Sequence, residues 1–215
     1  MALMRIRIRA ITVALALVLT MAVSRTQEAG SGALAILKLD PAHTRITFTL
    51  KGNAHNTEGS FTLKRGEIMV DPDSGKAHGI IVVDATSGRT GIIMRDNRMR
   101  DSILEAQRYP DISFMPRQAA GHPVPHGVFV VKVSGTFLLH GAQHDATLEV
   151  AINRTGDDFT ATSRFEIPYV AWGVKDPSLL FLRLDNRVQV EVSTSGHATW
   201  LPATVTPAAL SGQAR

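Results

Sequence analysis

The 215-residue chain contains no cysteine. Disulfides, thiolate metal sites, cysteine nucleophiles and a lipid-modified N-terminal cysteine are therefore excluded together. The stability of the folded domain must come from the packing of its core. A chain of this length can form one sizeable core without covalent cross-links.

The sequence also lacks the short motifs that accompany common catalytic sites. It contains no Gly-x-Ser-x-Gly elbow, no His-Glu-x-x-His pair, no phosphate-binding loop ending in Gly-Lys-Ser/Thr and no dinucleotide-binding Gly-x-Gly-x-x-Gly. We therefore do not expect an enzyme, and we expect no cofactor.

Eight histidines raise the question of a metal site. His122/His126 and His140/His144 are each four residues apart, a spacing that brings side chains together only on a helix. Prolines interrupt the first pair, and Gly141 places the second pair across a turn. We interpret these histidines as structural or surface residues and predict no metal site.

Excess positive charge is scarce outside the first segment of the chain. Residues 1–35 carry four of the 23 Lys and Arg but only one of the 19 Asp and Glu. The remainder therefore has 19 positive and 18 negative side chains and a net charge of +1. Such a domain has no bulk attraction for nucleic acid. We expect no nucleic-acid partner.

Residues 1–30 have the pattern of a secretory signal peptide. Arg5, Arg7 and Arg9 precede an apolar run from Ala10 to Val23, which is shorter than the roughly 20 residues that a membrane-spanning helix needs. We expect this segment to be cleaved, so that the mature protein is periplasmic or secreted by a bacterium. An uncleaved membrane anchor is the alternative.

The rest of the chain has the pattern of short β-strands separated by turns. Thr44–Leu50 alternates polar and apolar residues, as a strand with one buried face does, and turn residues near 71–75, 140–143 and 155–158 favour antiparallel hairpins. We predict an all-β domain over residues 36–200, an antiparallel barrel of about eight strands, followed by a disordered tail at 201–215. The other expected strands are Ala35–Leu39, Gly59–Leu63, Gly66–Val70, Gly79–Ala85, Ile112–Pro116, Gly127–Leu139, Asp145–Asn153, Phe159–Ile167 and Arg187–His197.

One segment, roughly Gly91–Gln107, has helical spacing. It places Met99 and Ile103 on one face of a short amphipathic helix. Two strands, Ile80–Val83 and Val128–Val131, are apolar on both faces. We expect the helix to pack on the barrel wall and cover such outward-facing side chains.

Aromatic residues and methionines occur on nearly every expected strand, where core packing accounts for most of them. An eight-stranded barrel, however, is about the size at which the interior either fills with side chains or holds one small ligand, as in lipocalins. In a hollow barrel these side chains would form the wall. The expected ligand-contacting residues are Phe48, Phe61, Met94, Met99, Phe114, Phe129, Phe137, Phe165 and Trp172.

The densest group of charges is Arg95-Asp96-Asn97-Arg98-Met99-Arg100-Asp101. Its plainest interpretation is a solvated helix face with ion pairs, among them Asp96 with Arg100. The alternative is that arginines lie at the mouth of a cavity, where a guanidinium can hold an anionic or hydroxyl head group. The head-group candidates are then Arg95, Asp96 and Arg100.

Four ordered motifs resemble a known family. They are Leu39-Asp40-Pro41-Ala42-His43-Thr44, Gly59-Ser60-Phe61, the block from Arg95-Asp96 to Tyr109-Pro110-Asp111-Ile112-Ser113-Phe114, and Gly135-Thr136-Phe137-Leu138-Leu139-His140-Gly141. Over about residues 38–198 the chain resembles the YceI-like family of periplasmic and secreted proteins. The resemblance implies a lipocalin-like barrel that encloses a polyisoprenoid or similar lipid without a cofactor. The chain departs from the family pattern at 141–146 and 167–184, which leaves the identity of the ligand open.

Three functions remain to be compared. The first is non-catalytic binding, storage or transport of a long apolar lipid by a monomer or homodimer, with transient contact to a membrane or membrane protein. The second is a secreted structural or stress-protective barrel whose interior is filled. The third is an enzyme that acts on an apolar substrate through Asp96 or a histidine. The volume of the barrel interior separates the second function from the other two.

Overall fold

The computed structural model describes residues 33–179 and 181–202. The predicted signal peptide, residues 1–30, lies outside the described residues, as does the predicted tail beyond residue 202. Within the described part of the chain, no helix is sufficiently long and apolar to cross a membrane.

The described residues form a β-barrel with a short helical segment at one end. The strands are β1 (Leu34–Leu39), β2 (Arg45–Gly52), β3 (Thr57–Val70), β4 (Ala77–Arg89), β5 (Asp111–Gly121), β6 (His126–Leu139), β7 (Ala142–Thr155), β8 (Asp158–Ile167) and β9 (Leu184–Leu201). All pairings between them are antiparallel, in the order β3-β2-β9-β8-β7-β6-β5-β4, and β4 returns to β3. The ring confirms the predicted antiparallel barrel of about eight strands.

β1 and β2 occupy one position in the ring. β2 pairs with β3 and β9 in one half of the barrel, and β1 pairs with the same two strands in the other half. Between them lies the 3₁₀ turn Pro41–His43, where the side chain of Asp40 accepts a hydrogen bond from the Ala42 N–H. A 2.6 Å hydrogen bond between the hydroxyls of Thr44 and Thr194 joins this break to β9. The first family-like motif therefore marks an interrupted strand.

The sequence predicted two strands, Gly59–Leu63 and Gly66–Val70, where the structure has the single strand β3. The register between β3 and β4 shifts between Leu63 and Arg65 instead of breaking. A bulge of this kind bends a strand and increases its twist while pairing continues on both sides. The predicted division into two strands is wrong, because the irregularity is absorbed within one strand.

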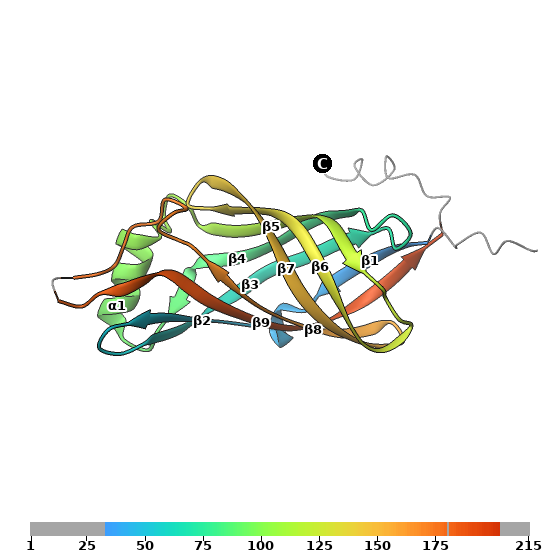
Figure 1. Ribbon diagram of the computed structural model, residues 1–215, viewed down its shortest axis with the longest axis horizontal. Helices are drawn as coiled ribbons and strands as arrows, with labels where there is room; N and C mark the ends of the chain where they lie inside the picture. Colours follow the sequence, from blue (N-terminus) through green and yellow to red (C-terminus); the bar gives the residue numbers. More distant parts are fainter. Residues whose placement is uncertain (1–32, 180, 203–215) are drawn as a thin grey trace, which may run out of the picture.

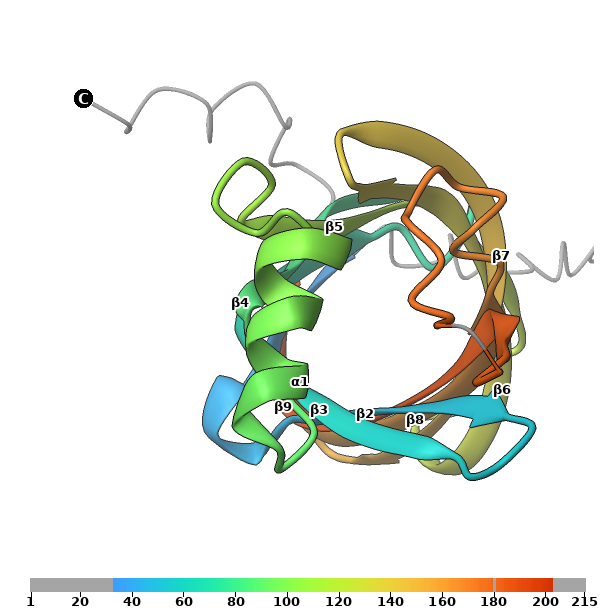
Figure 2. The same cartoon turned by 90° about the vertical axis from the view of Figure 1, so that its left-hand side faces the viewer.

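The helical segment lies at one end of the barrel, along one side of it, as Figures 1 and 2 show. It consists of α1 (Ile93–Arg98) and the π-helical turn η2 (Met99–Ile103). The prediction that it covers the barrel wall is wrong, since Val128 and Val130 on β6 are 70% and 54% exposed. The helix instead starts directly after β4 ends at the barrel rim, so its apolar side chains reach the open end.

The apolar core lies on the inner face of the barrel in two clusters. One includes Leu39, Leu63 and Phe159, and the other joins Leu50 and Leu139 to side chains of the helical segment. Both clusters and every paired strand fall within residues 34–201. This part of the chain contains a closed ring of hydrogen bonds and its own core, which are the elements an independently folding domain needs.

A substitution at Gly59 tests how tightly the strands of the barrel are packed. It lies opposite Phe48 on β2, and a Cβ atom at this position would collide with the Phe48 ring and with the Arg89 carbonyl oxygen. We expect Gly59→Ala to lower the free energy of unfolding by about 1–3 kcal/mol, as overpacking does. Urea unfolding measures the change. Ser60→Ala, at the exposed neighbouring position, serves as the control, and equal effects of the two substitutions would contradict this account.

Candidate functional site

The barrel is hollow. A cavity of about 540 Å³ extends along its interior and is lined by residues from both ends. Met99 and Leu104 line it at the helix end, Ile46 lies near its middle, and Pro123 and Trp200 line the opposite end. A volume of this size falls in the range of small-molecule binding sites. We call the end bordered by the helical segment the mouth.

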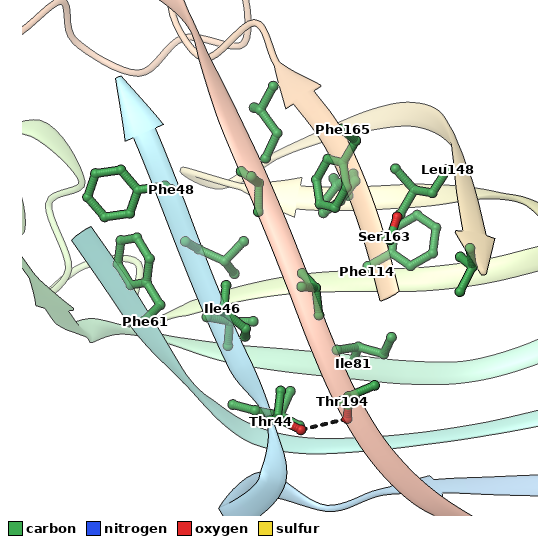
Figure 3. A pocket seen from close by; sticks show the side chains of 18 of the residues that line it. Thr44, Ile46, Phe48, Phe61, Ile81, Phe114, Leu148, Ser163, Phe165 and Thr194 are labelled. Carbon is green, nitrogen blue, oxygen red and sulfur yellow. Dashed lines mark hydrogen bonds between the residues drawn. The ribbon is translucent and has the colours of Figure 1, made fainter. Parts of the chain in front are cut away.

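Aromatic side chains project into the cavity from several strands (Figure 3). The Phe48 and Phe61 rings lie 5.4 Å apart between centroids, and Phe137 lies 4.8 Å from Phe114 and 5.9 Å from Phe165. These tilted pairs are a favourable arrangement for aromatic rings. The structure thus brings seven of the nine predicted ligand-contacting residues onto one wall, namely Phe48, Phe61, Met99, Phe114, Phe129, Phe137 and Phe165.

The structure places the other two, Met94 and Trp172, away from the cavity wall. The Met94 side chain is 84% exposed, because five residues of helix rotate it about 140° from Met99, which does face the cavity. Trp172 is half-buried and stacks on His144 with ring centroids 4.5 Å apart. Hydrophobicity alone did not distinguish these positions from wall positions.

Three arginines are the only charged side chains on the cavity wall within the described residues. Arg95 and Arg98 belong to the helical segment at the mouth, and Arg154 lies near the opposite end, with its guanidinium 4.4 Å from the Trp200 ring centroid. Arg98 was not among the head-group candidates predicted from the sequence. Its position three residues after Arg95 could have indicated it, because this spacing puts both side chains on one helix face. Arg100 instead bonds to the side-chain oxygen of Asn97.

Asp96 acts on Arg95 through Thr90. The buried Asp96 carboxylate accepts hydrogen bonds from the Thr90 N–H and hydroxyl, and these bonds lower the pKa of Asp96. The Thr90 hydroxyl and carbonyl in turn accept hydrogen bonds from Arg95 at 2.7 and 3.0 Å. Asp96 is therefore a positioning residue, and the predicted Asp96–Arg100 pair is replaced by bonds to Thr90 and Asn97.

The connection between β8 and β9, residues 168–179 and 181–183, borders the mouth opposite α1 (Figure 2), and we call it the strap. The Tyr169 hydroxyl donates a 2.7 Å hydrogen bond to the Asp185 carbonyl. Lys175 pairs with Glu105, just after the helical segment. The side chain of Asn53, between β2 and β3, donates to the Phe181 carbonyl at 2.9 Å. These bonds tie the strap to the rest of the rim.

A family model, the YceI-like domain, matches residues 37–195. The chain belongs to the YceI-like family. Among solved structures, it is similar to a polyisoprenoid binding domain from Saccharophagus degradans, with a TM-score of 0.60 and 17% identity over 76% of this chain and 98% of that one. It is also similar to BcnA from Burkholderia cenocepacia, with a TM-score of 0.59 and 18% identity over 73% of this chain and 98% of that one. At these identities the two likenesses establish the fold. No curated protein matches the chain in sequence.

The histidines of this YceI-like chain lie outside its cavity, with the exception of His55 at the mouth. His122 and His126 are exposed. His140 lies in the turn between β6 and β7, with Nε2 3.8 Å from Glu105, and His144 stacks on Trp172. Among the described residues, no three His, Asp or Glu side chains gather as a metal site would require.

Tyr169 should make the stability of the YceI-like barrel sensitive to alkali. Burial raises the pKa of Tyr169 to about 12. Its stabilising effect is therefore complete below pH 10, where the unfolded tyrosine is also neutral, and is lost as the pH rises to about 12. We expect Tyr169→Phe to cost about 1 kcal/mol near pH 8, the worth of one hydrogen bond, and less above pH 10. Urea unfolding across this range tests this, and a constant difference would contradict it.

Asp96 should have the opposite pH dependence. Because its folded-state pKa lies below the ordinary value of 3.8, its contribution is present above about pH 4 and is lost as the pH falls through the folded-state value. We expect Asp96→Asn to lower the melting temperature at pH 7, and we expect the difference from the wild type to shrink as the pH falls below 4. Thermal unfolding of both proteins at a series of pH values provides the measurement. An Asn variant as stable as wild type at pH 7 would remove the positioning role.

Proposed function

We propose that this YceI-like protein binds a long apolar lipid, of polyisoprenoid type, inside its barrel. The observation that carries the proposal is the cavity that extends along the barrel between walls of apolar side chains. The similarity to a structure described as a polyisoprenoid binding domain supports the choice of ligand class. An elongated tunnel accommodates an extended chain better than a compact ring system.

The energetics favour a long ligand. Each buried methylene contributes about 0.8 kcal/mol, so about 20 methylenes contribute about 16 kcal/mol, which exceeds most estimates of the cost of immobilising a ligand. A short hydrocarbon would not recover that cost. The apolar wall therefore selects for chain length more than for shape.

The mouth supplies contacts for a polar head group. Arg95 is oriented by Thr90 and Asp96, and Arg98 lies on the same part of the wall. No Asp or Glu lines the cavity within the described residues, so the local charge favours an anionic or hydroxyl head group. We propose that Arg95 and Arg98 hold it.

We further propose storage or transport without covalent chemistry, outside the cytoplasm. The 540 Å³ cavity argues against the alternative of a filled structural barrel. The enzymatic alternative loses Asp96 as its acid or base, since the Asp96 carboxylate is buried against Thr90 and does not line the cavity, and among the histidines of the described residues it keeps only the exposed His55 at the mouth. The apolar run after Arg9 supports export.

Blocking the cavity tests the proposal. We expect organic extraction and mass spectrometry of the purified protein to recover an apolar lipid, and Ala161→Phe to reduce its amount about tenfold or more, since displacing even two methylenes costs about 1.6 kcal/mol. Ala161 is on the cavity wall, whereas the next residue, Thr160, is exposed and faces outward.

Thr160→Phe is the matched control and should retain the lipid. A second wall substitution, Val150→Phe, guards against a folding defect specific to one site, and circular dichroism checks the fold of all three variants. Repeated recovery of no apolar molecule from the wild type, or equal retention by wall and control variants, would refute cavity binding.

A further inference from the structure

Large apolar side chains are exposed around the mouth of the barrel. The described residues include nine exposed large hydrophobic residues, and six of them lie on the two segments that border the mouth. Ile93 is 78% exposed and Phe181 is 91% exposed. The six, which we call the apolar rim, are Ile92, Ile93, Met94, Val170, Leu179 and Phe181.

The apolar rim has two parts that face each other across the opening. Ile92, Ile93 and Met94 belong to the start of the helical segment, whereas the other three belong to the strap. Figure 2 shows these two segments on opposite sides of the barrel opening, and Figure 1 shows both at the same end of the molecule. The rim therefore lies on two sides of the end of the barrel that we call the mouth, where residues of both segments line the cavity.

The backbone that carries the rim is anchored. Asn53 accepts a hydrogen bond from the Arg183 N–H and donates one to the Phe181 carbonyl, which holds the strap on both sides of residue 182. The Lys175–Glu105 pair joins the strap to the end of the helical segment. Exposure of the rim is thus a property of fixed segments.

Positive charge is concentrated at the same end. The segments that border the mouth, residues 51–58, 89–108 and 168–184, contain eight Lys and Arg against five Asp and Glu. The rest of the chain from residue 36 onward contains 11 Lys and Arg against 13 Asp and Glu. The Lys175–Glu105 pair cancels one charge of each sign, and the Asp96 carboxylate is bonded to Thr90. The mouth end is therefore positive, whereas the remainder of the domain is slightly negative.

We propose that the apolar rim docks the mouth onto an anionic lipid bilayer. Apolar side chains that flank cationic ones are suited to the membrane interface, where the apolar groups enter the acyl boundary and arginines contact phosphates. Docking in this orientation lets a lipid chain pass between bilayer and cavity without crossing water. The transfer of a lipid between bilayer and cavity rests on the proposed function. The docking surface itself is inferred from the exposed rim residues and the positive charge around them.

The charge also discriminates between occupants. A second copy of the chain that docked mouth to mouth would bring two positive surfaces together, which like-charge repulsion disfavours. An anionic bilayer provides the complementary sign together with an apolar layer for Ile93 and Phe181. Both features of the rim are satisfied by a lipid surface.

Vesicle flotation tests the proposal directly. The experiment uses residues 33–202, which contain the complete barrel, so that the apolar run Ala10–Val23 cannot itself bind lipid. Vesicles contain either phosphatidylcholine alone or phosphatidylcholine mixed with phosphatidylglycerol, and no protein. We expect the barrel to float with the anionic vesicles and to bind at least about tenfold less to neutral vesicles or at high salt.

Two matched double variants locate the docking surface. Ile93→Ser with Phe181→Ser removes one anchor from each side of the mouth, and we expect at least about tenfold weaker vesicle binding. Val128→Ser with Val130→Ser removes two exposed apolar residues near the opposite end of β6, about 35 Å away at about 3.3 Å per residue. This control should bind as the wild type does. Circular dichroism confirms that both variants fold.

The outcomes separate docking from cavity binding. The same preparations are extracted for lipid, and the rim variant should retain its cavity ligand, so loss of vesicle binding alone supports docking. Failure of the wild type to float, or equal loss in the rim and valine variants, overturns the docking proposal whatever the extracts contain. Flotation only with vesicles that carry membrane proteins would also overturn it and would indicate a protein partner.

Discussion

Closure of the sheet through the pairing of β4 with β3 is the constraint on which the rest of this structure depends. A closed ring has no free edges, so its backbone hydrogen bonds are satisfied without a second layer packing against it. The inner side chains then meet only one another. In this barrel they line its width without filling it, and the cavity is the space that remains.

Glycines opposite aromatic residues are part of how the ring accommodates its large side chains. Phe48 lies against Gly59, and Phe159 lies against Gly196, each on a directly paired neighbouring strand. The absence of a Cβ atom lets each ring lie flat on the adjacent backbone. The inner wall is therefore smooth and apolar, which suits a hydrocarbon chain and gives little to recognise in a polar one.

The mouth is organised differently from the wall. Here polar side chains are linked in short chains, from Asp96 through Thr90 to Arg95 and from Glu105 to Lys175. These contacts hold the helical segment and the strap at the rim, where the six residues of the apolar rim are exposed. One end of the barrel thus combines oriented arginines with exposed hydrophobic residues, and the proposed roles in head-group binding and membrane docking both arise from it.

Local sequence pattern determined much of this protein. Alternation in Thr44–Leu50 and turn residues such as His140-Gly141 predicted strands and hairpins correctly, because side-chain direction and turn conformation depend on near neighbours. The ordered motifs determined the family. Tertiary structure alone decided where the helix lies and that Met99, but not Met94 or Trp172, reaches the cavity. It also decided that Asp96 serves Arg95 through Thr90. These features depend on how distant segments meet around a closed ring, and no local pattern of hydrophobicity or charge records that geometry.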